Sequence, residues 1–183
     1  MTKYFSYYKE FGHEHKESIF LGYLKSQLLL NNFLVATPEP DIGEDIWVAK
    51  NNIESYQIYP AQIKSAFMYQ LVNKGEDKRY LLSIKFRRFE STLQRKFYYF
   101  FGLYDPDRIS GLFHIACIPS SFFLEHWDFL TNTKRITAKK YQGSDKQKIN
   151  LYFDYSLVKN EYYAFSKPRV NVTRFFRDFN EIY

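Results

Sequence analysis

Apolar residues recur at helical spacing over residues 13–31, with Leu24 and Leu28 on one side of the expected helix. This spacing predicts an α-helix, and the two asparagines at its end are a typical stop signal. Glu17 falls on the same face as these leucines. Its carboxylate is therefore expected either to point inward, toward a site on the neighbouring strands, or to be an ordinary solvated helix glutamate.

The pattern then changes to extended segments. A short strand is expected at 33–36, followed by an apolar run at 46–49 and a longer run at about 56–67. The last two runs are joined by asparagines and other polar residues, which is typical of a β-hairpin. This hairpin is the centre of the predicted organisation.

The rest of the chain predicts strands and short helices. A polar connection is expected over 68–78. Further strands are expected at 79–86, 96–103, 112–118 and 148–155, and helical segments at 87–95, 120–130 and 172–180. This order predicts an α/β fold of the α+β mixed-sheet kind, with about five strands. The helix over 13–31 should cover one face of the sheet, and the helix over 120–130 the other.

Length and composition are typical of a soluble globular protein. The 183 residues predict a single domain, 1–183, with an aromatic N-terminal arm at 1–12 and a C-terminal extension over about 131–183. Apolar residues make up 45% and charged residues 25%, and no apolar run is long enough to span a membrane. No signal peptide is evident and Cys117 is the only cysteine, so a cytoplasmic location without disulfides is expected.

The net charge of +6 and the pI near 9.2 are consistent with a polyanionic partner. Residues 131–148 are basic and polar, and would form either a loop over a DNA duplex or a plain solvated connection. The residues expected to contact phosphates are Lys134, Arg135, Lys139 and Lys140. Core packing explains the aromatic fraction of 21% better than base stacking does.

Polar side chains gather at the predicted hairpin. Because side chains alternate along a strand, Gln62 and Lys64 should share one face while Ile63 points into the core. Asp45 directly precedes the neighbouring strand, with Glu44 and other acids close to it in the sequence. A carboxylate, an amide oxygen and an ammonium on one side can hold a divalent metal against a phosphate. The alternative for Asp45 is a hydrogen bond within its own turn.

The order Asp45, hairpin, then Gln62-Ile63-Lys64 resembles the active-site signature of the PD-(D/E)XK nuclease-like superfamily, in its Gln-x-Lys variant. The segments that also look like this branch are Gln27 to Val35, Phe100 to Asp105 and Ile118-Pro119-Ser120. The resemblance covers about residues 13–130. It implies a restriction-endonuclease-like core, in which helices flank a central mixed sheet.

The resemblance further implies a metal-dependent DNA endonuclease of restriction or defence type, which hydrolyses phosphodiester bonds with Mg²⁺ or Mn²⁺. Asp45 and Gln62 would then be metal ligands, and Lys64 would orient or deprotonate the attacking water. Members of the superfamily often add an acid from the first helix. Glu17 is the candidate for this third ligand, although the usual position of that acid falls on Leu21.

Two other functions stay open. The same fold can serve as a catalytically inactive nucleic-acid-binding module, or the chain can be a protein-interaction partner from a mobile element. A homodimer is compatible with all three functions. Metal-dependent nicking separates the first function from the second, and salt-dependent DNA binding separates both from the third.

Overall fold

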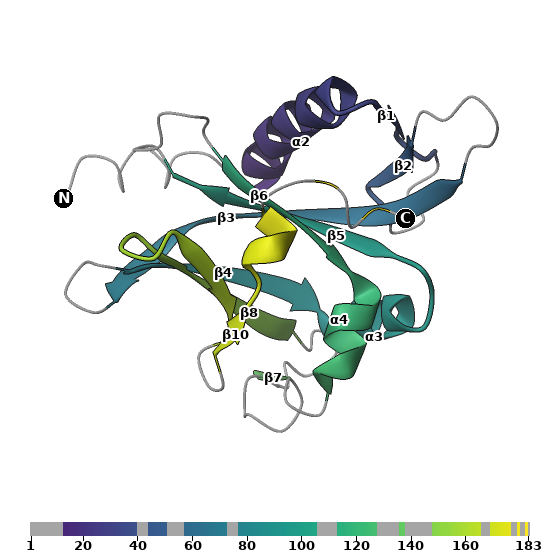
Figure 1. The fold of residues 1–183 in the computed structure, drawn as a ribbon. Coiled ribbons are helices and arrows are strands. Elements are labelled where there is room, and N and C mark those ends of the chain that lie inside the picture. The colour runs from purple at the N-terminus through teal and green to yellow at the C-terminus, as the bar shows by residue number, and fades with distance from the viewer. Residues whose placement is uncertain are drawn as a thin grey trace.

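The computed structural model describes residues 13–39, 44–50, 57–72, 77–105, 113–127, 136–137, 148–165, 169–176, 179 and 182. In these residues the chain has a mixed α+β fold dominated by antiparallel strand pairs, with a few helices (Figure 1). The predicted mixed-sheet class is therefore confirmed. None of the described helices is long and apolar enough to cross a membrane.

The first helix and the hairpin form as the pattern predicts. Helix α2 covers His13–Leu30, and strands β1 (Phe33–Ala36), β2 (Ile46–Lys50) and β3 (Ile58–Val72) follow it as an antiparallel meander. Asn32 lies just after the helix with a φ of 62°, a left-handed conformation that asparagine tolerates better than most residues. The predicted hairpin of β2 and β3 is confirmed.

Strand β3 is longer than predicted. It continues to Val72 and pairs there with β4 (Asp77–Lys85), with a register shift between Met68 and Gln70. The prediction of a polar connection over 68–78 is therefore wrong for residues 68–72, which belong to β3, and for residues 77 and 78, which belong to β4. Residues 68–72 remain extended because pairing with β4 satisfies their backbone hydrogen bonds.

A helix connects β4 to the next strand. Helix α3 (Phe86–Leu93) leads to β5 (Tyr98–Tyr104), which runs parallel to β3. Strand β6 (Phe113–Pro119) pairs antiparallel with β5, and helix α4 (Ser120–Glu125) follows it. One branch of the sheet therefore has the order β1-β2-β3-β5-β6.

Strand β4 begins a second branch of the sheet. It pairs with β8 (Lys148–Ser156), and the pairing continues through β9 (Glu161–Ala164) to β10 (Val170–Asn171). Strand β7 (Ile136–Thr137) also pairs with β8, and a short 3-10 helix, η2 (Thr173–Phe176), lies in the segment predicted to be helical at 172–180. The described residues thus form a ten-stranded sheet, and the prediction of about five strands is wrong.

Two hydrophobic clusters lie on the two faces of β3 and β5. Helix α2 packs in one cluster through Phe20 and Leu24, together with Ile63 and Phe100 of the strands. Phe20 lies so close to Gly102 that a Cβ there would be 2.4 Å from the ring. Helices α3 and α4 pack in the second cluster, on the other side of these strands (Figure 1). The predicted placement of helices on opposite faces is confirmed.

Candidate active site

The sheet has an interruption in the middle of β3. Pairing with β2 ends at Ala61 and pairing with β4 begins at Met68. From Gln62 to Phe67, β5 is the only strand that pairs with β3 in the described part of the chain. Backbone groups of β3 that face away from β5 therefore need partners from elsewhere.

Asp45 supplies one of these partners. It directly precedes β2, and its backbone N–H donates to the Ala61 carbonyl at 2.9 Å. Its carboxylate reaches further along β3 and accepts the Ile63 N–H at 2.8 Å. The Asp45 side chain thus continues the hydrogen-bond ladder where the backbone of β2 has ended. The alternative prediction for Asp45 was a hydrogen bond within its own turn. The bond described here instead reaches a different strand, β3.

Lys64 pairs with Glu17 across the interruption. The Lys64 Nζ lies 2.8 Å from Glu17 Oε1, and the two side chains are 20% and 41% exposed. Lys64 leaves β3 on the face opposite to Ile63, which packs under α2. Because Glu17 belongs to α2, the lysine side chain has to pass the unpaired edge of β3 to reach it. An ion pair this exposed contributes only about 0–1 kcal/mol to stability.

Gln62 is buried without a partner for its carbonyl oxygen. The residue is 1% exposed, and its Oε1 accepts no hydrogen bond from the described residues. It lies next to Tyr99 of β5 in the parallel register. A buried acceptor without a donor costs about 1–3 kcal/mol. The oxygen is therefore an unused electron-pair donor at the candidate site.

Asp45 and Lys64 make their contacts at the part of β3 around Ile63, and Gln62 is placed there by its position in the strand. Asp45 binds the Ile63 backbone, Gln62 and Lys64 flank this residue, and Glu17 joins through Lys64. Glu17 and Asp45 are only two carboxylates, and no group of three His, Cys, Asp or Glu side chains suited to a metal is found among the described residues. A metal at this point would need further oxygen ligands besides these two carboxylates. The basic residues predicted to bind phosphates, Lys134, Arg135, Lys139 and Lys140, lie outside the described residues.

Glu44, the acid next to Asp45 in the sequence, forms an ion pair with Arg95. Glu44 is 8% exposed, and its Oε1 lies 2.9 Å from Nη1 of Arg95. Its Oε2 accepts a hydrogen bond from the Trp47 Nε1–H at 2.6 Å. The sequence placed Glu44 among several acids near Asp45, but nothing in the sequence linked it to Arg95.

Sequence patterns also missed a buried polar cluster between the two branches of the sheet. Asp105 accepts a hydrogen bond from Lys78 Nζ at 2.8 Å through Oδ1, and its Oδ2 lies 3.0 Å from His114 Nε2. The other ring nitrogen of His114 bonds to the Tyr162 hydroxyl. All four residues are buried. These side-chain bonds join the four residues to one another, and the cluster is therefore a polar connection between strands.

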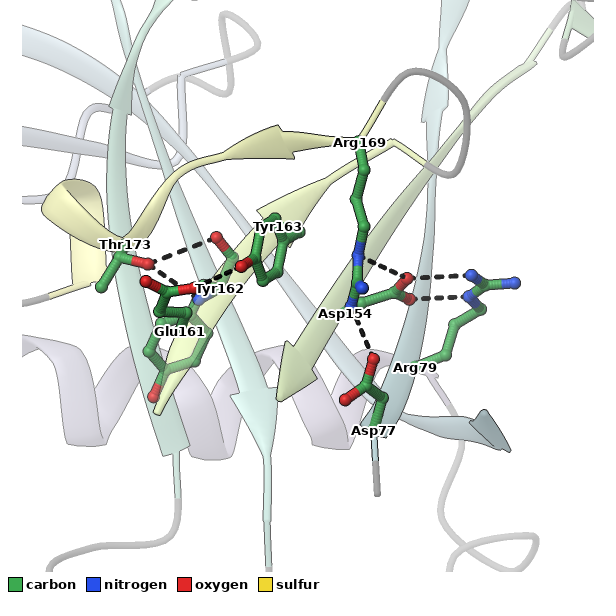
Figure 2. Close-up of polar contacts among 8 residues, drawn as sticks. All are labelled: Asp77, Arg79, Asp154, Glu161, Tyr162, Tyr163, Arg169 and Thr173. Atoms are coloured by element: carbon green, nitrogen blue, oxygen red, sulfur yellow. Dashed lines mark hydrogen bonds and ion pairs between the residues drawn. The ribbon is translucent and has the colours of Figure 1, made fainter. Parts of the chain in front are cut away.

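Ion pairs on the second branch use its two buried aspartates (Figure 2). Arg79 donates to both carboxylate oxygens of Asp154, at 2.7 and 2.9 Å, and Arg169 donates to Asp77 at 2.6 Å. The hydrogen bond to Asp154 raises the pKa of Arg79 above its usual value. These carboxylates are engaged by arginines and are poor candidates for metal ligands.

No protein-family model, curated protein or solved structure matches this chain. A functional argument therefore rests on the geometry at β3.

Proposed function

We propose that this protein is a metal-dependent DNA endonuclease of restriction or defence type, with its active site at the interruption of β3. The observation that carries the proposal is the buried Gln62 Oε1, which has no hydrogen-bond donor among the described residues. Gln62 directly precedes Ile63, whose N–H binds the Asp45 carboxylate, and it lies two positions before Lys64, which pairs with Glu17.

The order of elements supports the proposal. The resemblance implies a helix, a strand, a strand preceded by Asp and a strand with Gln-x-Lys. Elements α2, β1, β2 and β3 follow each other in this order. Strand β5 then lies parallel to β3, after helix α3. The insertion of β4 between β3 and α3, and the later strands β8 to β10 that extend its branch, depart from the simplest form of a restriction-endonuclease-like core.

The oxygens present fit a hard divalent cation such as Mg²⁺ or Mn²⁺. Asp45 offers a carboxylate and Gln62 an amide oxygen. The Ile63 carbonyl is a third donor, because it shares the strand edge of the Ile63 N–H that binds Asp45. When bound, such a cation supplies charge that neutralises a phosphate oxygen and lowers the pKa of a water.

Lys64 provides the positive charge of the protein at this site. Its ammonium can orient the attacking water and stabilise the negative charge that develops on the phosphate in the transition state. Glu17 holds the ammonium at 2.8 Å, and this bond limits the directions that the long side chain can take. The contact favours a positioning role for Glu17 over the role of a metal ligand.

Cleavage of supercoiled and linear DNA tests the proposal. The wild-type protein should nick or cut in the presence of Mg²⁺ or Mn²⁺ and stop when a chelator is added. Lys64→Ala should reduce the rate by about 10²–10⁴-fold, the range for a positioned acid–base or charge-stabilising group. DNA binding by this variant should persist, because backbone contacts elsewhere supply most of the affinity.

Lys159→Ala is the matched control for charge. Lys159 is exposed in the turn between β8 and β9, so its removal lowers the net charge equally and should leave the rate unchanged. Metal-independent binding without any cleavage would reject the endonuclease in favour of an inactive binding module. Absence of both binding and cleavage would reject a role with DNA altogether.

A further inference from the structure

Arg95 is a half-exposed cation whose position is fixed from several sides. Its side chain is 48% exposed, yet Nη1 lies 2.9 Å from the buried Glu44, and the guanidinium carbon lies 5.0 Å from the centre of the Phe97 ring. Its backbone carbonyl accepts the Ser120 hydroxyl at 2.7 Å. An exposed arginine without such contacts would lose rotamer entropy on binding a ligand, and here much of that loss has already occurred.

These contacts connect Arg95 to the two segments next to β3 at the candidate active site, namely the residues before β2 and strand β5. Glu44 directly precedes Asp45, the residue that binds the Ile63 N–H. The Phe97 ring lies 5.2 Å from the Tyr99 ring, and Tyr99 is the neighbour of Gln62 in the register of β5 with β3. The guanidinium therefore lies beside the face of the sheet that carries Gln62.

Neutralisation of Glu44 uses only part of the guanidinium. Arginine carries five N–H donors in a planar fork, and the bond to Glu44 is made by Nη1. Glu44 also receives the Trp47 N–H, so both of its oxygens are bonded. The exposed part of Arg95 retains donors in the geometry that suits a phosphate, which arginine binds through two parallel hydrogen bonds.

We propose that Arg95 binds a backbone phosphate of the DNA next to the phosphodiester that is cleaved, and so sets the position of the strand at the interruption of β3. This inference rests on the proposed function, since it names a substrate contact of the same site. A phosphate contact positions DNA and carries no base specificity. Arg95 is thus expected to act on all sequences alike.

Arg95→Gln tests the contact. Glutamine keeps an N–H donor for the buried Glu44 but removes the charge, so the fold should persist, which a thermal melt verifies. We expect KM for DNA to rise about tenfold with kcat within about threefold, because a lost phosphate contact weakens binding of all states. In EDTA, the slope of log affinity against log salt should fall in magnitude by about one. Arg95→Lys should restore the salt slope and only part of KM.

Arg174→Gln is the matched control. Arg174 is also exposed and also stacks on a phenylalanine, at 4.6 Å from the Phe175 ring, but belongs to η2. An unchanged salt slope for Arg95→Gln, or an equal fall for Arg174→Gln, would overturn the contact. If the wild type cleaves DNA but Arg95→Gln leaves the salt slope unchanged, only the Arg95 contact is rejected and the endonuclease proposal stands. The specific fall in slope together with absence of metal-dependent cleavage supports the contact and rejects the endonuclease.

Discussion

Replacement of Gln62 by methionine should make the protein more stable and less able to respond to metal. Methionine has a similar length and volume but no polar group that needs a partner. The wild-type carbonyl oxygen is buried without a hydrogen bond, which costs about 1–3 kcal/mol. Repacking after a swap of similar volume costs less than about 1.5 kcal/mol. The expected net gain in the absence of metal is therefore about 1 kcal/mol, or about 2–4 °C in Tm for a chain of this size.

In the presence of metal, wild type should become more stable than Gln62→Met. A cation that binds only the folded wild type stabilises it by about 2.7 kcal/mol at a concentration 100 times Kd. Gln62→Met lacks the ligand oxygen and should gain much less. The assay is thermal unfolding, followed by circular dichroism, of both proteins in EDTA and in excess MgCl₂. Wild type should melt lower in EDTA and higher in MgCl₂.

Two results would refute this reasoning. A lower Tm for Gln62→Met in EDTA would mean that the Gln62 oxygen is satisfied in solution and that its burial carries no information on a ligand. An equal response of both proteins to MgCl₂ would remove Gln62 from the metal site. Gln94→Met is the control, because Gln94 is exposed at the end of α3 and should change neither value.

Three further predictions concern the ion pair, the core and the basic segment. Glu17→Gln should slow cleavage while changing the free energy of unfolding by less than about 1 kcal/mol, as measured by urea denaturation, because the pair with Lys64 is exposed; a large loss of stability would show a structural role instead. Gly102→Ala should lower stability by about 1–3 kcal/mol, since the added Cβ meets the Phe20 ring at 2.4 Å, and an unchanged Tm would show that α2 shifts freely. Replacement of the basic residues by alanine should weaken DNA binding and reduce the salt slope, with Lys134, Arg135, Lys139 and Lys140 changed together. Metal should stabilise this variant as much as it stabilises wild type.

Local periodicity explains which parts of the fold could be predicted. The spacing of Leu24 and Leu28 was enough for α2, and both residues are fully buried. Alternation around Ile63 placed Gln62 and Lys64 on one face of the hairpin strand. Asp45 was placed by its position before an apolar run. Each of these inferences needs only the geometry of one helix or one strand, which a few neighbouring residues set.

Pairing between distant segments decided the rest. Residues 68–72 extend β3 because β4 supplies their hydrogen bonds, although their sequence predicted a polar connection. The short strands β9 and β10 exist for the same reason. Periodicity marked seven extended segments and the predicted sheet had about five strands, whereas the described sheet has ten.

The chemistry of the site also depended on tertiary structure. Glu17 and Lys64 are 47 positions apart, and sequence left open whether this glutamate faces solvent or the strands. Their contact arises because α2 packs on the sheet just where β3 lacks a partner strand. The ion pair of Glu44 with Arg95 also joins segments far apart in the sequence, because Glu44 precedes β2 and Arg95 follows α3. Sequence determined which side chains each element carries, and only the packing of the elements decided which of them meet, because long-range contacts follow from burial and strand pairing rather than from local spacing.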